Sequence, residues 1–288
     1  MDKTVNSVGE YLTILFGKIK ENKQKDTMLF YRGQASVDYD FVPKVMRTKY
    51  VQHENEIYNR AMVENTKDFE HLTTANEVLS KMQHYGIPTR LLDITTNPLV
   101  ALYFACSGDV EKDKDGTVYI LTPNLIDEVR PYDSDRISIL SALPRFSSKE
   151  KNDIRELAER EKEIEKFNNE AIIKRLLHEI KKEKPSFENI INPNDLLKNF
   201  YFIPKKTNDR IVKQSGAFII FGLSQEKMKN SGDKNIYDKI IVKSSQKNEI
   251  LKELSILEIN RFSLFPELDC RALEICNSFA EEKSEDKQ

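Results

Sequence analysis

The chain opens with apolar residues at helical spacing and continues with a short extended segment. Val8, Tyr11 and Leu15 belong to a helical pattern that ends at the polar run 21–26. Residues 28–31 then form an uninterrupted apolar run of the kind found in strands. This pattern predicts an N-terminal helix, followed by a strand that ends at the next Arg-Gly pair.

Two capping boxes mark the starts of later helices. Residues 50–84 are helical in pattern, and Thr74 and Glu77 have the spacing at which each side chain caps the backbone of the other. This spacing predicts a fresh helix that stops at Gly86. Ser147-Ser148-Lys149-Glu150 repeats the signal and starts a long charged helix.

That charged helix belongs to a segment, about residues 148–198, that looks like an insertion or a bundle beside a sheet. One apolar face continues from Ile154 to Leu176, with a break expected near Asn168-Asn169. Its basic end is most simply a solvated helix terminus that matches the helix dipole. Contact with an acidic partner is the alternative.

Four short apolar segments have the length and composition of strands. They are residues 89–95, 116–121, 217–221 and 239–242. Asn97-Pro98 starts a helix between the first two, since proline suits the first helical turn. A strand, a helix and a strand in close succession indicate a layered unit. We therefore expect an α+β fold with a small mixed sheet flanked by helices.

Composition favours one globular domain over residues 1–288. Apolar residues make up 39% of 288, and Lys+Arg (45) nearly balance Asp+Glu (47), so the net charge of −2 gives no general attraction for nucleic acid. The longest apolar run, 99–106, is too short to span a bilayer, and the N-terminus has no signal-peptide layout, so we expect a cytoplasmic protein without a membrane partner. Helices at 248–254 and 266–279 and a frayed tail at 281–288 close the chain. Cys106, Cys270 and Cys276 are expected as buried thiols rather than a disulfide or a reactive site.

The densest polar cluster lies at residues 83–97, around the apolar pair Leu91-Leu92. Apolar neighbours that must be buried carry these polar side chains into or beside the core, where each needs a partner. The simpler alternative is a structural network in which Arg90 and Asp93 brace a turn and Asn97 caps a helix. The cluster comprises Gln83, His84, Tyr85, Thr89, Arg90, Asp93, Thr95, Thr96 and Asn97.

Arg32 is the second candidate. A guanidinium beside a glycine can bind a phosphate or carboxylate through two hydrogen bonds, while Gly33 allows close approach of the backbone. Tyr31 and Gln34 are also suited to ligand contact. A structural ion pair of Arg32 with Asp93 or with another carboxylate is the alternative.

Later in the chain, Gln214 precedes the strand that begins after Gly216, where it would lie at the rim of a site. An ordinary turn explains the same pattern. Phe265-Pro266-Glu267-Leu268-Asp269 is most simply a helix start, and we do not expect its acidic residues to be catalytic.

The sequence lacks the common phosphate-loop, dinucleotide, nucleophile-elbow and zinc-protease motifs. The four histidines have no spacing typical of a metal site, so no metal is expected.

In order along the chain, these motifs resemble those of the FRG-domain family. The resemblance rests on Tyr31-Arg32-Gly33-Gln34 and on the motif from Gln83 to Thr95 with Asn97-Pro98. It continues in Arg210, Gln214, Gly216 and Phe218 and in the motif from Phe265 to Asp269. It spans about residues 25 to 275, with residues 148–198 as local elaboration. Cys270 departs from the glycine that the family pattern would favour.

A looser similarity links the same order of motifs to ADP-ribosyltransferases and implies NAD as a substrate. It implies that Arg32 holds the dinucleotide phosphates, that Thr89 or Thr95 supports the nicotinamide ribose, and that Gln214 orients the sugar. A cationic transition state needs such positioned dipoles more than a strong nucleophile. The neighbouring residues implied in NAD binding are Tyr31, Gly33, Gln34, His84, Arg90 and Asp93.

Position 214 carries an amide where such enzymes usually have a carboxylate, which leaves Glu258 or Asp93 to supply one. The first hypothesis is therefore an NAD-dependent transferase of toxin or phage-defence type that modifies a protein or nucleic acid, with an antitoxin or chaperone as a further partner. The second is a non-catalytic module that binds a nucleotide or nucleic acid in the same pocket. A metal-dependent nuclease is weaker, because the cluster supplies one acid, Asp93.

Overall fold

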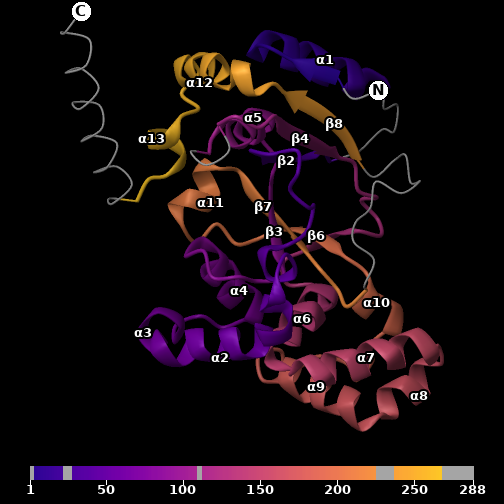
Figure 1. The fold of residues 1–288 in the computed structure, drawn as a ribbon. Helices are drawn as coiled ribbons and strands as arrows, with labels where there is room; N and C mark the ends of the chain where they lie inside the picture. Colours follow the sequence, from indigo (N-terminus) through magenta and orange to yellow (C-terminus); the bar gives the residue numbers. More distant parts are fainter. Residues whose placement is uncertain (1–2, 22–27, 109–111, 225–236, 268–288) are drawn as a thin grey trace, which may run out of the picture.

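The structure is a computed structural model that describes residues 3–21, 28–108, 112–224 and 237–267. Eight strands in these residues form one mixed sheet with the order β1-β8-β4-β2-β3-β7-β6-β5 (Figure 1). They are β1 (Lys3–Val5), β2 (Phe30–Gln34), β3 (Leu91–Thr95), β4 (Gly116–Leu121), β5 (Val129–Pro131), β6 (Phe200–Ile203), β7 (Gly216–Ile220) and β8 (Tyr237–Val242). The α+β class and the mixed sheet agree with the prediction, but the sheet is larger than expected.

The sheet consists of two halves that are joined by the short pairing between β2 and β3. β1, β8, β4 and β2 form the first half, and β3, β7, β6 and β5 form the second. β2 pairs with β4 over five residues, and β3 pairs with β7 over five. In the described residues, β2 and β3 share the single residue pair Tyr31–Thr95. The two halves are thus free to diverge on either side of this pair.

β3, α5 (Pro98–Cys106) and β4 form the strand–helix–strand unit that the sequence indicated. β2 is antiparallel to both β3 and β4, so these two strands run parallel with β2 between them. α5 lies directly on β2, since a Cβ at Gly33 would come within 1.9 Å of the Ala101 carbonyl oxygen. The Arg-Gly pair therefore lies inside β2 rather than at its end, and the expectation of a strand end there was wrong.

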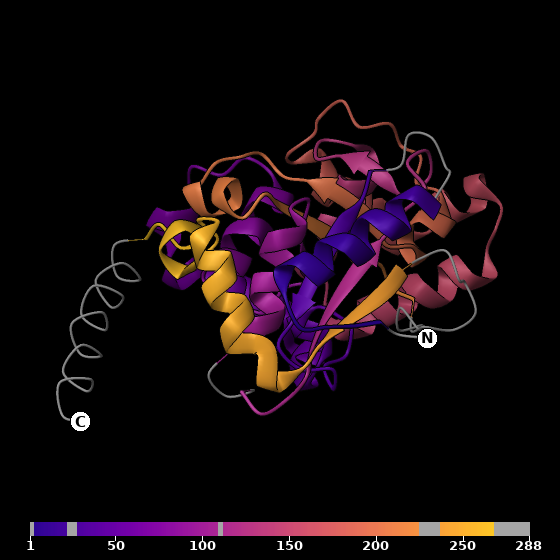
Figure 2. The same ribbon diagram turned by 90° about the horizontal axis from the view of Figure 1, so that it is seen from above.

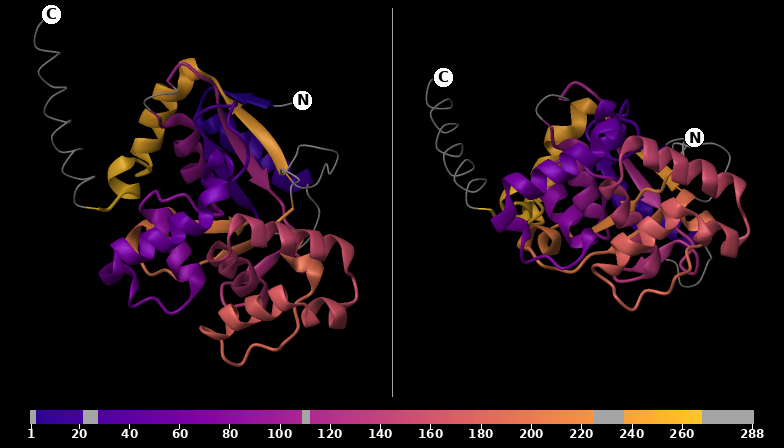
Figure 3. Two further views of the ribbon diagram at one scale, coloured as in Figure 1. Left: turned by 60° about the horizontal axis from the view of Figure 1, so that its bottom comes forward. Right: turned by 90° about the horizontal axis from the view of Figure 1, so that it is seen from below.

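Different helices cover the two halves. α1 (Val8–Glu21), α5 and α12 (Lys247–Ile256) share one apolar core with the first half (Figures 1 and 2). α2 (Glu54–Glu64), α4 (Ala75–His84) and α6 (Asp135–Ala142) cover the second half together with α7 (Ser148–Arg160) and α9 (Ala171–Lys181), and Figure 3 shows α2 to α4 beside the helices of the insertion. Shorter helices are α3 (Thr66–Phe69), α8 (Ile164–Asn169), α10 (Pro193–Leu197), α11 (Asp209–Lys213) and α13 (Arg261–Leu264).

The predicted helix starts are confirmed at both capping boxes. Glu77 accepts a hydrogen bond from the backbone of Thr74 at 3.2 Å, and Glu150 accepts one from Ser147 at 2.8 Å. The charged segment forms α7, α8 and α9. The break at Glu170 confirms the one expected near Asn168-Asn169, whereas the break at residues 161–163 was not predicted.

A buried cluster of three charges joins the insertion to the fold. Arg90 binds both carboxylate oxygens of Glu54 in α2, at 2.9 and 2.6 Å, and donates to the Phe221 carbonyl at 2.9 Å. Lys151 in α7 donates to the same carboxylate at 2.7 Å. Burial would raise the pKa of Glu54, but Arg90 and Lys151 lower it below its usual range.

Of the three cysteines, Cys106 is buried in α5, and burial raises the pKa of its thiol to about 12. Cys270, Cys276, Asp269, the helix expected up to residue 279 and the tail at 281–288 lie outside the described residues. No helix in the described ranges is both long enough and apolar enough to cross a membrane.

Candidate functional site

A cavity of about 240 Å³ lies where the two halves of the sheet meet. β2, β3 and β7 form its floor, and α4, α5 and α11 contribute to its walls. It brings together seven of the predicted site residues, which come from segments far apart in the chain: Tyr31, Arg32, Gly33, His84, Asp93, Thr95 and Gln214.

Arg32 spans the junction between the halves. Its Nη1 donates a hydrogen bond to the Asp93 carbonyl oxygen of β3. Its Nε is buried and has no hydrogen-bond partner among the described residues. Burial lowers the pKa of this guanidinium to about 10, partly offset by Asp93, so Arg32 remains cationic at neutral pH. Arg32 thus combines a structural contact with a free N–H.

A chain of hydrogen bonds fixes the Asp93 carboxylate. The Thr89 hydroxyl donates to Oε1 of Gln83 at 2.7 Å, and Nε2 of Gln83 donates to Oδ2 of Asp93 at 2.6 Å. The hydroxyl thereby sets the orientation of the Gln83 amide. Thr89 is buried and does not line the cavity, so it acts on Asp93 only through Gln83.

Thr95 and Gln214 meet on the opposite side of the cavity floor. The Thr95 hydroxyl donates to the Gln214 carbonyl at 2.7 Å and accepts from the Asn97 backbone at 2.9 Å. Asn97 caps α5 through the Leu99 N–H, as predicted. The Gln214 side chain donates to the Leu264 carbonyl at 3.1 Å, which ties it to α13.

The structure does not bring Arg90 or Gln34 to the cavity. Arg90 is 2% exposed and is held by Glu54 and Phe221, which matches the structural alternative. Gln34 is buried and donates to the Asp40 carbonyl at 3.3 Å. Gly33 does line the cavity, but the close contact that demands a glycine is the packing of α5.

Arg210 is a second cation at the cavity. It was named in the family resemblance, but it was not among the predicted site residues. Its guanidinium lies over the ring of Phe265, 4.8 Å from the centroid, and its Nη1 is 3.5 Å from the His84 carbonyl oxygen. Phe104 and Phe218 add apolar walls; Phe218 was part of the family resemblance, but only the fold shows that both rings lie at the cavity. Glu258, a predicted source of a carboxylate, is exposed in a turn and does not line the cavity.

Glu267 lies beside His84, where Oε1 is 3.4 Å from the imidazole Nε2. Both oxygens of this carboxylate, and Nδ1 of His84, are buried without a hydrogen-bond partner in the described part of the chain. Such atoms are uncommon in folded proteins and mark places where a ligand or proton can be bound.

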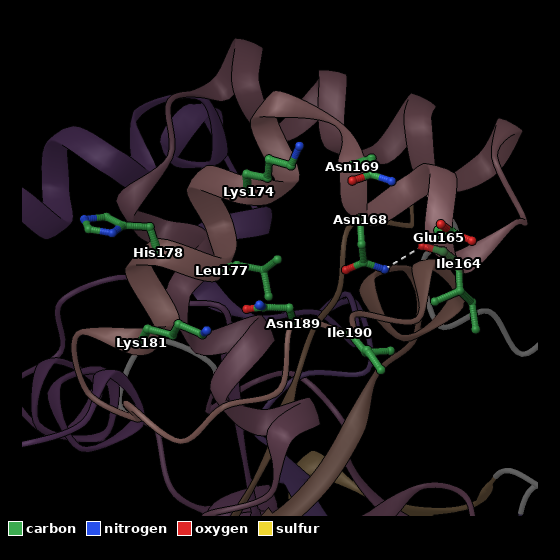
Figure 4. A pocket seen from close by; sticks show the side chains of 10 residues that line it. All are labelled: Ile164, Glu165, Asn168, Asn169, Lys174, Leu177, His178, Lys181, Asn189 and Ile190. Carbon is green, nitrogen blue, oxygen red and sulfur yellow. Dashed lines mark hydrogen bonds between the residues drawn. The ribbon is translucent and has the colours of Figure 1, made fainter.

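A larger hollow of about 730 Å³ lies on the insertion, between α8, α9 and residues 189–190 (Figure 4). Asn168 at its wall already donates to the Ile164 carbonyl at 2.7 Å. None of its lining side chains has a buried polar atom without a partner. The cavity at the sheet junction, whose walls do include such atoms, is therefore the better candidate site.

Comparison with protein families bears on the same cavity. Residues 27–114 match the FRG domain. The FRG segment includes β2, α4, β3 and α5, and it supplies Arg32, His84, Asp93 and Thr95. Arg210, Gln214 and Glu267 lie outside it. No curated protein and no solved structure matches the chain. Within the described ranges, no three His, Cys, Asp or Glu side chains are grouped as metal ligands.

Proposed function

We propose that the cavity binds NAD and that the chain is an ADP-ribosyltransferase-like enzyme of toxin or phage-defence type, acting on a protein or nucleic acid. The observation that supports this is that Arg32, Thr95 and Gln214, far apart in sequence, line one cavity. Their order along the chain is the order that the resemblance to these enzymes implies, with Arg32 in β2, Thr95 in β3 and Gln214 just before β7.

Two cations would receive the pyrophosphate. Arg32 has a free Nε, and Arg210 lies at the same cavity over an aromatic ring. Guanidinium groups suit phosphate oxygens because they donate two parallel hydrogen bonds. The volume of about 240 Å³ is below the ~300–1,000 Å³ of typical ligand pockets, so the cavity would hold the nicotinamide ribose, with the adenosine at its mouth.

Asp93 would supply the carboxylate that position 214 lacks. Nicotinamide leaves from a sugar that develops positive charge, and a fixed negative group stabilises that charge. Gln83 holds the Asp93 carboxylate in one orientation, so little reorganisation is needed during the reaction. Phe104 and Phe218 would flank the nicotinamide ring.

The test measures nicotinamide release and label transfer from NAD to cell extract. We expect activity in the wild type and a loss of roughly 100-fold or more in Asp93→Asn, as for removal of other electrostatic catalytic groups. Arg32→Lys should mainly raise KM. Lys174→Ala, in the distant hollow of Figure 4, is the matched control. A wild type that neither transfers label nor releases nicotinamide refutes the proposal.

A binding module without chemistry is the second candidate. It is favoured by the amide at position 214, whose Nε2 is already engaged with the Leu264 carbonyl. Thermal unfolding with NAD, ATP or short RNA would separate the two, since a ligand at a hundred times its Kd adds about 2.7 kcal/mol. Stabilisation without turnover supports binding alone.

A further inference from the structure

His84 and Glu267 form a pair at the edge of the cavity that the proposed roles leave unused. The imidazole Nε2 is 3.4 Å from Oε1 of Glu267, and the two side chains are 16% and 26% exposed. Both carboxylate oxygens and the imidazole Nδ1 lack hydrogen-bond partners among the described residues. A carboxylate shielded from water and without a donor is well placed to stabilise a proton that the neighbouring imidazole takes up.

The fold fixes Glu267 in this place although it lies far from His84 in sequence. Phe265 packs between the ring of Phe104, at 6.1 Å between centroids, and the guanidinium of Arg210. The Gln214 side chain holds the Leu264 carbonyl. Residues 264–267 are therefore packed against the wall of the cavity.

The surroundings of His84 favour the neutral form of its imidazole. Burial lowers the pKa of His84, and Arg210 from α11 and Lys81 from α4 act in the same direction. Glu267 opposes them and raises it. A neutral imidazole accepts a proton, and the adjacent carboxylate then stabilises the imidazolium.

We propose that His84 is the base that takes the proton of a hydroxyl acceptor and that Glu267 is its positioning residue. The inference rests on the proposed function. The acceptor oxygen forms a bond to C1′ of the nicotinamide ribose while the C–N glycosidic bond breaks. The electron pair of that bond leaves with nicotinamide, which departs neutral. The acceptor proton passes to the imidazole, whose Nδ1 is the unpartnered nitrogen.

This assignment narrows the acceptor to a protein hydroxyl. A carboxylate acceptor is already ionised at neutral pH and needs no base, whereas an alcohol must lose a proton. A net charge of −2 gives no general attraction for nucleic acid, which favours a serine or threonine of a protein. The product is then an O-glycoside, which hydroxylamine does not cleave.

The experiment compares His84→Gln and Glu267→Gln with matched controls, His178→Gln and Glu165→Gln, which lie in the distant hollow (Figure 4). Transfer and nicotinamide release are measured against pH with full-length protein. We expect His84→Gln to lower kcat for transfer by roughly 10²–10⁴-fold. Glu267→Gln should move the acid limb of kcat/KM to lower pH, because the carboxylate that raises the pKa of His84 is gone. The controls should match the wild type.

A second readout does not depend on activity. Nuclear magnetic resonance titration gives the imidazole pKa of His84, whose signal is assigned by its absence in His84→Gln. This pKa should fall in Glu267→Gln. If the imidazole pKa of His84 is unchanged in Glu267→Gln, the two side chains do not interact, and Glu267 is not the positioning residue of His84, whatever the activity of the variant. If the wild type transfers label and both variants keep its pH profile, the base assignment fails while the proposed function stands.

If the wild type neither transfers label from NAD nor releases nicotinamide, the proposed function and the base assignment fail together. The imidazole titration then still tests whether His84 and Glu267 interact. Label that hydroxylamine releases, or that nuclease rather than protease removes, overturns the protein hydroxyl as the acceptor.

Discussion

Removing Arg90 should destabilise the protein strongly without touching the cavity. Arg90→Met deletes two hydrogen bonds to the Glu54 carboxylate and one to the Phe221 carbonyl. Hydrogen bonds to charged groups contribute about 1.5–3 kcal/mol each, and breaking a buried ion pair costs about 3–5 kcal/mol. Because Lys151 still faces Glu54, we expect a loss of about 3–5 kcal/mol in the free energy of unfolding rather than the sum of three bonds.

Urea unfolding measures this loss, followed by circular dichroism and by tyrosine fluorescence, since the chain has 11 tyrosines and no tryptophan. Arg60→Met is the matched control, because Arg60 also pairs with a glutamate at 2.6 Å but lies exposed on α2. That pair is open to solvent, so its loss should change the free energy of unfolding far less than the loss of Arg90. Equal losses in the two variants would refute the reasoning. Replacing Glu54, Arg90 and Lys151 together with apolar residues should recover most of the stability.

Three further predictions concern packing, reactivity and pH. Gly33→Ala should lower the melting temperature sharply, since the new Cβ would lie 1.9 Å from the Ala101 carbonyl oxygen, whereas Gly17→Ala in α1 meets no atom within 4 Å and should stabilise the helix by up to about 1 kcal/mol. A thiol count with a disulfide reagent at about pH 8 should give the same value for native wild type and Cys106→Ala, because burial raises the pKa of Cys106 to about 12; a difference of one thiol would contradict this. Burial alone would raise the pKa of Glu77, but hydrogen bonds from Lys205 and Thr73 lower it to about 2. The stability that this carboxylate contributes is therefore present above its unfolded pKa and is lost as the pH falls toward about 2. In Glu77→Gln, the melting temperature should depend less on pH over that range.

Local signals in the sequence predicted the elements that depend on local interactions. The capping boxes at Thr74 and Ser147 marked true helix starts, since the bonds that define them join residues three apart. Asn97 caps α5 for the same reason. The strand at residues 116–121 was predicted because its apolar run is continuous.

The strands that were missed are short, and they are β1 and β5 at the two edges of the sheet and β6 next to β5. β1 and β5 have three residues each, and β6 has four. Segments of this length carry little periodicity, and their pairing depends on partners far along the chain. The same dependence explains why β2 continues through Arg32, since β4 pairs with it up to Gln34.

The density of polar residues located the cavity, but it could not assign every role. Arg32 and Arg90 look alike in sequence, and only the fold shows that Glu54, which lies 36 residues before Arg90, holds Arg90 in the core. Glu267 was predicted at the start of a helix whose later residues lie outside the described ranges, and its position beside His84 was not predicted. Such pairings leave no pattern in a single sequence.

The cavity at the junction of the two half-sheets has a consequence for any shortened form of this protein. A fragment limited to residues 27–114 would keep Arg32 and Asp93 but lose Arg210, Gln214 and Glu267, together with the strand β7 that pairs with β3. The shortest piece that keeps the whole lining of the cavity and its neighbour Glu267 runs from β2 to Glu267. The segment that matches the family and the segment that builds the cavity therefore have different boundaries in the chain.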